Sequence, residues 1–240
     1  MSFCARAALP SRFIAGLLLA FCAMPWILAA ESWQEALART PIDRAPAELN
    51  RTNCVALMLR AFRSNQTVKA LIFMPGATDE FYMFHRARAV LANTNPTLLD
   101  AVAALTNQTL IRATFFSPLL LLHTDEDPLE PLIRIEHQPT AGKLRGHSFL
   151  PHLALNDRDW AFVQPLLKKK LGVDIRPWRR SDESWHFYRH SFAAWNLTDW
   201  EALEAVALAG KTKCNVQRHR IIFEGDERVR STPRFEQYPH

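Results

Sequence analysis

Residues 94–123 read TNPTLLDAVAALTNQTLIRATFFSPLLLLH, and this stretch decides which kind of fold to expect. Asn95 is predicted to cap a helix that runs from Pro96 to Leu105. Asparagine accepts hydrogen bonds at helix starts, and proline fits the first helical position. Two apolar runs around a serine-proline turn, Leu110 to Phe116 and Leu119 to His123, predict two strands. The stretch therefore predicts a helix followed by a pair of strands.

Similar elements are predicted before this stretch and again after it. Apolar residues at helical spacing predict helices, and apolar runs bounded by turn residues predict strands. In the first half these are a helix within 53–63 and strands at 68–74 and 81–91. In the second half they are a helix from Asp157 or Asp159 to Leu171, strands at 173–178 and 185–195, a helix at 198–209, and strands at 214–218 and 220–224. Both halves therefore have the predicted order α-β-β-α-β-β.

The two halves also share a short sequence pattern. A shift of 104 residues places LDAVA at 99–103 on LEAVA at 203–207. This similarity predicts a layered α/β (α+β) fold made of two tandem α-β-β-α-β-β units that arose by internal duplication. The alternative is that two amphipathic α/β units have converged on similar patterns.

The N-terminus has the pattern of an export signal. Arg6 and Arg12 precede an apolar run from Phe13 to Phe21, and the small residues Ala29 and Ala30 precede Glu31. The alternative is an anchor helix that stays uncleaved. The predicted division is a signal peptide (1–30), an N-terminal lead (31–47), the first unit (48–127), a connector (128–152), the second unit (153–227) and a C-terminal tail (228–240). We therefore expect a secreted or periplasmic protein without a membrane span after residue 30.

Composition narrows the class of protein. The chain is 48% hydrophobic and 22% charged, values that exclude a disordered chain, a collagen-like repeat and a polytopic membrane protein. Export and the absence of a nucleic-acid-binding motif argue against nucleic acid as a partner. The sequence has no CxxC pair and no zinc-ligand spacing, so we expect no metal and no cofactor.

Each predicted unit resembles the short N-terminal module of secretins and TonB-dependent receptors. That family pattern is a helix, a strand pair, a second helix and a hairpin ending in aliphatic residues. The matching stretches are Thr97–Val102 with Leu119–Leu122, and Glu201–Val206 with Ile221–Phe223. The resemblance implies a non-enzymatic binding or adaptor role in the cell envelope.

Cys54 and Cys214 are the two cysteines outside the predicted signal. In an oxidising compartment they could form one disulfide. The alternative is two buried thiols.

A weaker resemblance connects the chain with α/β-hydrolases. The strand and acidic turn at 119–128 resemble those of that family, with Asp125 or Asp127 orienting His186 or His190 as the base. The family's nucleophile motif G-x-S-x-G is absent from the sequence. A secreted hydrolase-like enzyme with an unconventional nucleophile is therefore the alternative function.

Residues 141–240 contain 17 basic and 12 acidic residues, and basic and aromatic residues alternate in parts of this half. Strand alternation predicts one exposed face for these residues. The ligand-binding candidates are Arg176, Trp178, Arg180, His186, Tyr188 and His190. Arginine next to aromatic rings suits an anionic glycan or an acidic protein surface. The alternative is a solvated face with one packed tryptophan.

Overall fold

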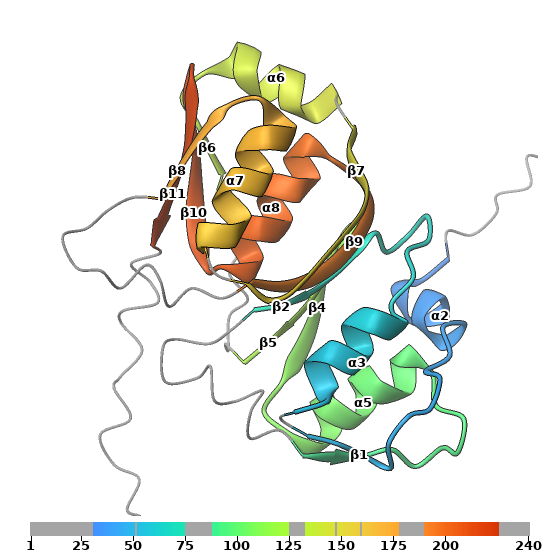
Figure 1. Cartoon of the computed structure of the whole chain (residues 1–240). Coiled ribbons are helices and arrows are strands. Elements are labelled where there is room, and N and C mark those ends of the chain that lie inside the picture. Colours follow the sequence, from blue (N-terminus) through green and yellow to red (C-terminus); the bar gives the residue numbers. More distant parts are fainter. Residues whose placement is uncertain are drawn as a thin grey trace, which may run out of the picture. The chain divides into compact units, whose positions relative to one another are not determined.

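The computed structural model describes residues 31–50, 52–74, 88–124, 133–146, 148–158, 160–177 and 190–225, all within the unit Glu31–His240. In the first half the elements are α2 (Trp33–Ala38), β1 (Glu48–Leu49), α3 (Cys54–Ala61), β2 (Ala70–Phe73), β3 (Ala89–Val90), α5 (Leu98–Gln108), β4 (Arg112–Phe116) and β5 (Leu119–His123). Helices and strands alternate along the chain, and the strands form sheets that contain parallel and antiparallel pairs. The predicted α/β class is therefore confirmed (Figure 1).

The second half contains more elements than predicted. They are β6 (Ile133–Ile135), α6 (Gln138–Gly146), β7 (Ser148–Arg158), α7 (Trp160–Leu171), β8 (Asp174–Pro177), β9 (His190–Thr198), α8 (Asp199–Ala209), β10 (Thr212–Val216) and β11 (Arg220–Gly225). The segment expected to be a connector thus contains β6, α6 and the start of β7. None of the helices in the described ranges is long and apolar enough to span a bilayer.

Strand pairing follows one scheme in both halves. In the first half β1 and β3 are antiparallel, β2 and β5 are parallel, and β4 and β5 are antiparallel. In the second half the same relations join β7 with β9, β8 with β11, and β10 with β11. Element order and pairing are thus alike from β1 to β5 and from β7 to β11. Internal duplication would explain this agreement and stays a prediction.

The helix start predicted at Asn95 is wrong. Thr97 is the N-cap of α5, and its side chain and Asp100 form a capping box. Thr198 and Glu201 form the predicted capping box of α8. The two N-caps lie 101 positions apart, so Ala101 matches Ala202 rather than Ala205. With this alignment every buried residue of α5 matches a buried residue of α8.

Two further pairings join the strands into larger sheets. Antiparallel pairing of β2 with β9 gives the five-stranded sheet β4-β5-β2-β9-β7, and parallel pairing of β6 with β10 gives the four-stranded sheet β6-β10-β11-β8. The five-stranded sheet has α3 and α5 on one side and α7 and α8 on the other (Figure 1). Strand alternation therefore sends side chains into two cores.

Both faces of the five-stranded sheet are apolar. Leu71 and Leu120 pack into the core of the first-half helices, whereas Ile72 and Leu121 pack into the core that contains α8. These four side chains are fully buried, and burial of each contributes about 2 kcal/mol to folding. The parallel pair β2–β5 corresponds to the parallel pair β8–β11. When the registers of the two pairs are aligned, Ile72 matches Arg176 and Leu121 matches Ile222.

Of the two alternatives for Cys54 and Cys214, the structure shows two buried thiols and not the candidate disulfide. Cys54 begins α3 in the first-half core, whereas Cys214 lies on β10 in the other core. The five-stranded sheet separates these cores, so the side chains cannot meet. Desolvation raises the pKa of Cys54 to about 11 and also raises that of Cys214 above the usual thiol value. Both thiols therefore stay protonated at neutral pH.

Candidate functional site

The outer face of the four-stranded sheet carries the polar side chains that could form a site. On β10, Cys214 and Val216 point into the core, so Asn215 points to the other side. On β8, Ile175 is buried and Arg176 is exposed, as the sequence alternation predicts. We call this surface the polar face; its members are Arg134, Glu136, Asp174, Arg176, Lys213, Asn215, Gln217, Arg220, Ile222 and Glu224.

Strand register aligns four members of the polar face in one row across the sheet. Asn215 is paired with Arg134 on β6 and with Ile222 on β11. Ile222 is in turn paired with Arg176 on β8. Because neighbouring strands lie about 4.8 Å apart, the two arginines are about 14 Å apart at their backbones. The row is thus a cation, an amide, an apolar side chain and a second cation.

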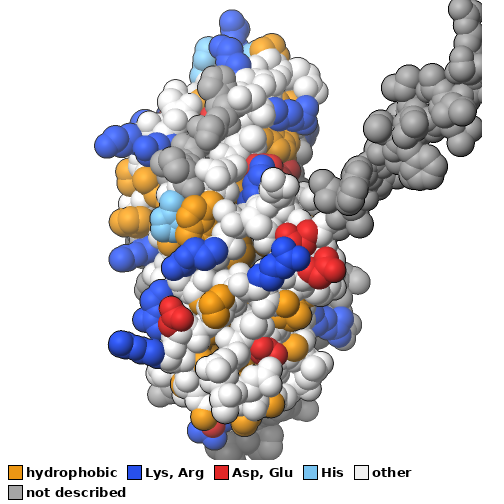
Figure 2. All heavy atoms as spheres, turned by 90° about the vertical axis from the view of Figure 1, so that its right-hand side faces the viewer, with side chains coloured by type: hydrophobic (Ala, Val, Ile, Leu, Met, Phe, Trp, Pro, Cys, Tyr) orange, Lys and Arg blue, Asp and Glu red, His pale blue; other side chains and the backbone are white. Residues whose placement is uncertain are grey.

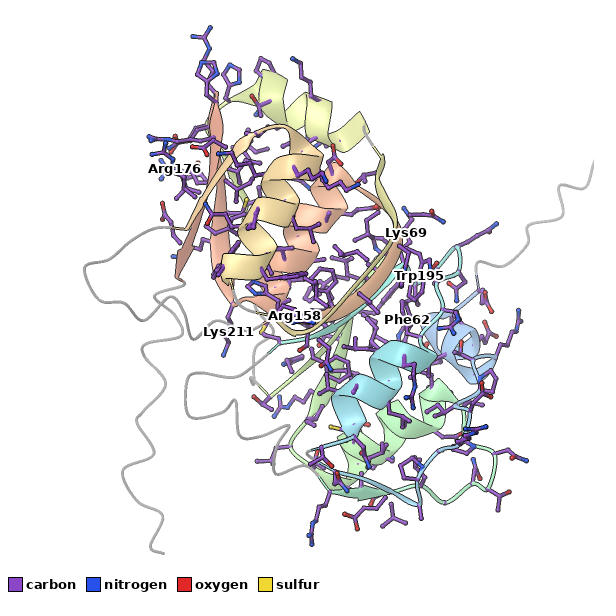
Figure 3. All side chains as sticks on the ribbon, viewed as in Figure 1. Phe62, Lys69, Arg158, Arg176, Trp195 and Lys211 are labelled. Carbon is purple, nitrogen blue, oxygen red and sulfur yellow. The ribbon has the colours of Figure 1, made fainter. Side chains whose placement is uncertain are left out.

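The two arginines at the ends of this row reach into solvent. The side chain of Arg134 is 80% exposed and that of Arg176 is 61% exposed. Figure 3 shows Arg176 on the side of the sheet that faces away from α7 and α8. Both guanidinium groups are therefore accessible to a ligand that lies on the sheet.

A hydrogen-bonded row runs beside the first one. Glu136 accepts from Asn215 Nδ2 at 2.8 Å and from Gln217 Nε2 at 2.9 Å. Arg220 Nε donates to Gln217 Oε1. The hydrogen bond from Asn215, supported by that from Gln217, lowers the pKa of Glu136 below its usual value. Glu136 is therefore a carboxylate at neutral pH and holds both amide side chains in fixed orientations.

Asp174 organises the β8 end of the polar face. Its Oδ2 lies 2.6 Å from Arg176 Nε, and its Oδ1 lies 3.2 Å from Lys168 Nζ of α7. The hydrogen bond from Arg176, followed by that from Lys168, lowers the pKa of Asp174. The carboxylate of Asp174 therefore holds the side chains of Lys168 and Arg176 near each other.

Asn215 is the one member of the polar face with a buried, unsatisfied atom among the described residues. The residue is 8% exposed, and its Oδ1 is buried without a hydrogen bond. The carboxylate of Glu136 fixes the amide orientation, because only Nδ2 can donate to it. A buried acceptor without a partner costs about 1–3 kcal/mol. Because Oδ1 is closed off from solvent, a ligand that lies on the sheet does not reach this acceptor.

His190 does not belong to an exposed binding face, so this expectation is corrected. It is fully buried at the start of β9, with Nδ1 3.2 Å from the carbonyl oxygen of Arg158 and its ring edge-on to Trp160. The prediction treated its strand as having one solvated face, but β9 is an inner strand of a sheet that is buried on both faces.

Of the remaining candidates, only Arg176 lies within the described residues. Those outside them are Asp125, Asp127, Trp178, Arg180, His186 and Tyr188. The structure therefore brings Arg176 together with residues that sequence reasoning did not single out.

One signal in the sequence could have identified two of those residues. Residues 213–217 read KCNVQ, in which apolar residues alternate with polar ones, and this alternation places Asn215 and Gln217 on one face. Arg134 and Glu136 were missed because their segment was expected to be a connector. Nothing in the sequence indicates that β6 adds to the edge of β10, since the two strands are far apart along the chain.

Basic charge alone does not identify the polar face. Figure 2 shows a side of the molecule turned away from it, and lysine and arginine side chains are scattered along that side too, with acidic ones among them. Within the described ranges no three potential metal ligands lie together. The distinguishing feature of the polar face is its ordered network rather than its charge.

Comparison with known proteins gives no relative for this chain. No protein-family model matches it, and neither does any curated protein or solved structure.

Proposed function

We propose that this chain is an exported, non-enzymatic binding or adaptor protein of the cell envelope or the extracellular space. In this proposal two related α/β units form a rigid scaffold, and the polar face of the four-stranded sheet binds an anionic partner. The export pattern at residues 1–30 supports the location. The resemblance of each half to the short N-terminal module of secretins and TonB-dependent receptors supports a binding role.

One observation carries the proposal: matched positions of the two halves differ in chemistry. Ile72 and Leu121 are fully buried, whereas their counterparts Arg176 and Ile222 lie on an outer face. A surface that only had to be soluble would not need an ordered network that includes a nine-tenths buried amide. The network therefore supports recognition of a ligand.

The charges of the polar face and its neighbour on α7 favour an anion. Five cations (Arg134, Lys168, Arg176, Lys213 and Arg220) outnumber the three carboxylates, Glu136, Asp174 and Glu224. Glu136 and Asp174 are engaged in hydrogen bonds within the network. An anionic glycan and an acidic protein surface are the two classes of partner that this charge suits.

Retention of the purified protein on immobilised anionic polymers tests the proposal. We expect Arg134→Gln with Arg176→Gln to weaken retention and lower the salt concentration at which the protein elutes, because exposed charges act through screened attraction. The matched control removes two exposed cations of the first half, Arg60→Gln with Arg88→Gln. Equal loss of retention in both double variants would contradict the proposed site, since only overall charge would then matter.

The hydrolase alternative gains no support from the described residues. His190 is buried in a sheet that is covered on both faces. Asp125, Asp127 and His186 lie outside the described ranges.

A further inference from the structure

We propose that the side-chain amides of four asparagines are attachment sites for N-linked glycans: Asn50, Asn65, Asn107 and Asn196. Each begins a tripeptide Asn-x-Thr in which x is not proline. This is the pattern at which oligosaccharides are attached to asparagine in secreted proteins. The inference rests on the exported location in the proposed function and concerns residues outside the polar face.

The pattern occurs more often than the composition of the chain explains. The chain has nine asparagines, and serine and threonine together make up 24 of its 240 residues. One of these two residues should therefore follow an asparagine at the second position about once in the whole chain. Four such tripeptides are present, and all four contain threonine. The excess calls for a reason beyond chance.

The amide nitrogens of the four sites are accessible. A glycan is attached through Nδ2, so a modified asparagine cannot use this atom to hold the fold together. Among the described residues, Nδ2 of each of the four sites has no hydrogen-bond partner, and none of these four atoms is buried. Asn107 and Asn196 are exposed, and Asn50 and Asn65 are half-buried.

Asparagines outside the pattern use the same atom differently. Nδ2 of Asn53 donates to a backbone carbonyl oxygen at 3.1 Å. Nδ2 of Asn93 and Nδ2 of Asn215 donate to carboxylates at 2.7 Å and 2.8 Å. Three of the five other asparagines thus need the amide nitrogen for the fold, whereas within the described ranges none of the four sites does.

At two of the sites the fold uses the amide oxygen only. Asn50 Oδ1 accepts from the backbone N–H of Thr52 at 3.0 Å and from its hydroxyl group at 2.8 Å. Asn65 Oδ1 accepts from the backbone N–H groups of Thr67 and Val68 at 2.8 Å and 2.7 Å. Aspartate forms such turns equally well. The turns therefore explain the oxygen at these positions, and the glycan explains the nitrogen.

The sites lie on elements other than the four-stranded sheet. Asn50 precedes α3, Asn65 lies between α3 and β2, Asn107 is in the last turn of α5, and Asn196 is on β9. Asn196 has a φ of 52°, a left-handed conformation that asparagine tolerates. The strands that carry the polar face have no such tripeptide. Modification is thus directed to the scaffold and not to the proposed binding face.

The reaction joins Nδ2 to carbon C1 of a sugar. The donor is an oligosaccharide that is bound through C1 to a lipid pyrophosphate. The bond between C1 and the pyrophosphate oxygen breaks, and the lipid pyrophosphate leaves with its electron pair. The bond between Nδ2 and C1 forms, and Nδ2 loses one proton. No oxidant or reductant is needed.

Intact-mass spectrometry of the full exported chain, isolated from the cells that naturally make it, tests the inference. We expect a mass above that of the polypeptide, and an amidase that cleaves N-linked glycans should remove the excess and leave aspartate at each site. One glycan should be lost in each of the variants Asn50→Asp, Asn65→Asp, Asn107→Asp and Asn196→Asp. Aspartate keeps the shape and the acceptor oxygen of asparagine, so these variants retain the local turns.

Two results would overturn the inference. An exported protein with the mass of the bare polypeptide would refute the glycans and leave the proposed function standing. A mass excess that persists when all four sites are replaced would place the modification elsewhere. Protein that is found only inside the cell would instead contradict the proposed function together with the inference that rests on it.

Asn95 provides the matched control. It is exposed and is followed by Pro96 and Thr97, so it lacks only a permitted middle residue. Asn95→Asp should leave the mass excess unchanged, and Pro96→Ala should add one glycan at Asn95. Loss of a glycan in Asn95→Asp, or no gain in Pro96→Ala, would show that the tripeptide does not direct the modification and would overturn the assignment.

Discussion

Two groups of three strands, β4-β5-β2 and β10-β11-β8, have the same strand directions but different outer faces. In the first group Ile72 and Leu121 are buried in the core that contains α8. In the second group the matched residues are Arg176 and Ile222 on the polar face. The inner faces of both groups remain apolar and pack on helices. The same strand pairing thus occurs with a buried and with an exposed outer face, and the outer face is free to take on a separate role.

The edges of these two groups differ in the same way. The edge of β2 is extended by antiparallel pairing with β9. The edge of β8 is occupied by the hydrogen bond from Gln164 to Ile175 and by Pro177. Proline and side-chain blocking are common ways to end a sheet. The first group therefore continues into the second half through the pairing of β2 with β9, whereas β8 of the second group ends its sheet.

Charged substitutions at matched positions should give the largest difference between the groups. Leu121→Asp places a carboxylate in a fully buried position between the sheet and α8. We expect it to lower the free energy of unfolding by more than about 4 kcal/mol or to prevent folding. Ile222→Asp, at the matched position, should change it by no more than about 1 kcal/mol because the side chain lies on the outer face.

Urea denaturation followed by circular dichroism measures this difference. Leu121→Ala is the control, since it removes the side chain without adding charge and should cost about 2–5 kcal/mol. Similar losses for Leu121→Asp and Ile222→Asp would show that the two outer faces are equally buried, and the comparison would fail.

Local elements of this fold could be predicted because they depend on nearby residues. The capping box of Thr198 and Glu201 is visible as a spacing of three residues, and alternation separates Ile175 from Arg176. The start of α5 was misplaced although Thr97 and Asp100 have the same spacing. The pair Asn95-Pro96 gave a competing signal, and the reciprocal hydrogen bonds of the box decide between them.

Contacts between distant segments could not be predicted. Nothing near β2 in the sequence indicates that β9 will pair with it, so the burial of both sheet faces and of His190 was missed. The polar face also depends on β6, which joins β10 from a segment without a strong strand pattern. Of the candidate site, only Arg176 was identified in advance, and the alternation in residues 213–217 could have added Asn215 and Gln217. Which strands lie beside them depends on strand pairing and could not be predicted.

The ends of the matched helices give a second, smaller difference between the halves. The C-cap of α5 is Thr109, whereas the C-cap of α8 is Gly210. A Cβ atom at Gly210 would lie 2.5 Å from His190 Nε2, a ring atom fixed in the core. We therefore expect Gly210→Ala to destabilise the fold by about 1–3 kcal/mol, the usual cost of overpacking. Thermal unfolding measures the loss.

Gly142→Ala on α6 is the matched control for this substitution. Apart from the neighbouring backbone of α6 itself, no heavy atom lies within 4 Å of the position that a Cβ atom would take at Gly142. Alanine stabilises a helix by about 0.5–1 kcal/mol relative to glycine, so this variant should be at least as stable as the parent protein. A Gly210→Ala variant as stable as the Gly142→Ala variant would show that the ring of His190 is not held against α8.

The smallest expected effect concerns the acid dependence of the polar face. Asp174 takes the position that Ala70, a residue without charge, has in the first group. Its pKa lies below the ordinary 3.8 because of the hydrogen bonds from Arg176 and then Lys168. A carboxylate whose pKa is lowered by folding stabilises the folded state above its unfolded pKa, and this contribution is lost as the pH falls through the folded value. Asp174→Asn should therefore reduce stability slightly at pH 7 and have no such effect in strong acid.

In an NMR titration of the side-chain carboxyl, Arg176→Gln should move the midpoint of Asp174 upward, and Lys168→Gln should move it less. A midpoint that stays the same in Arg176→Gln would show that the pair seen on β8 does not hold the carboxylate in solution.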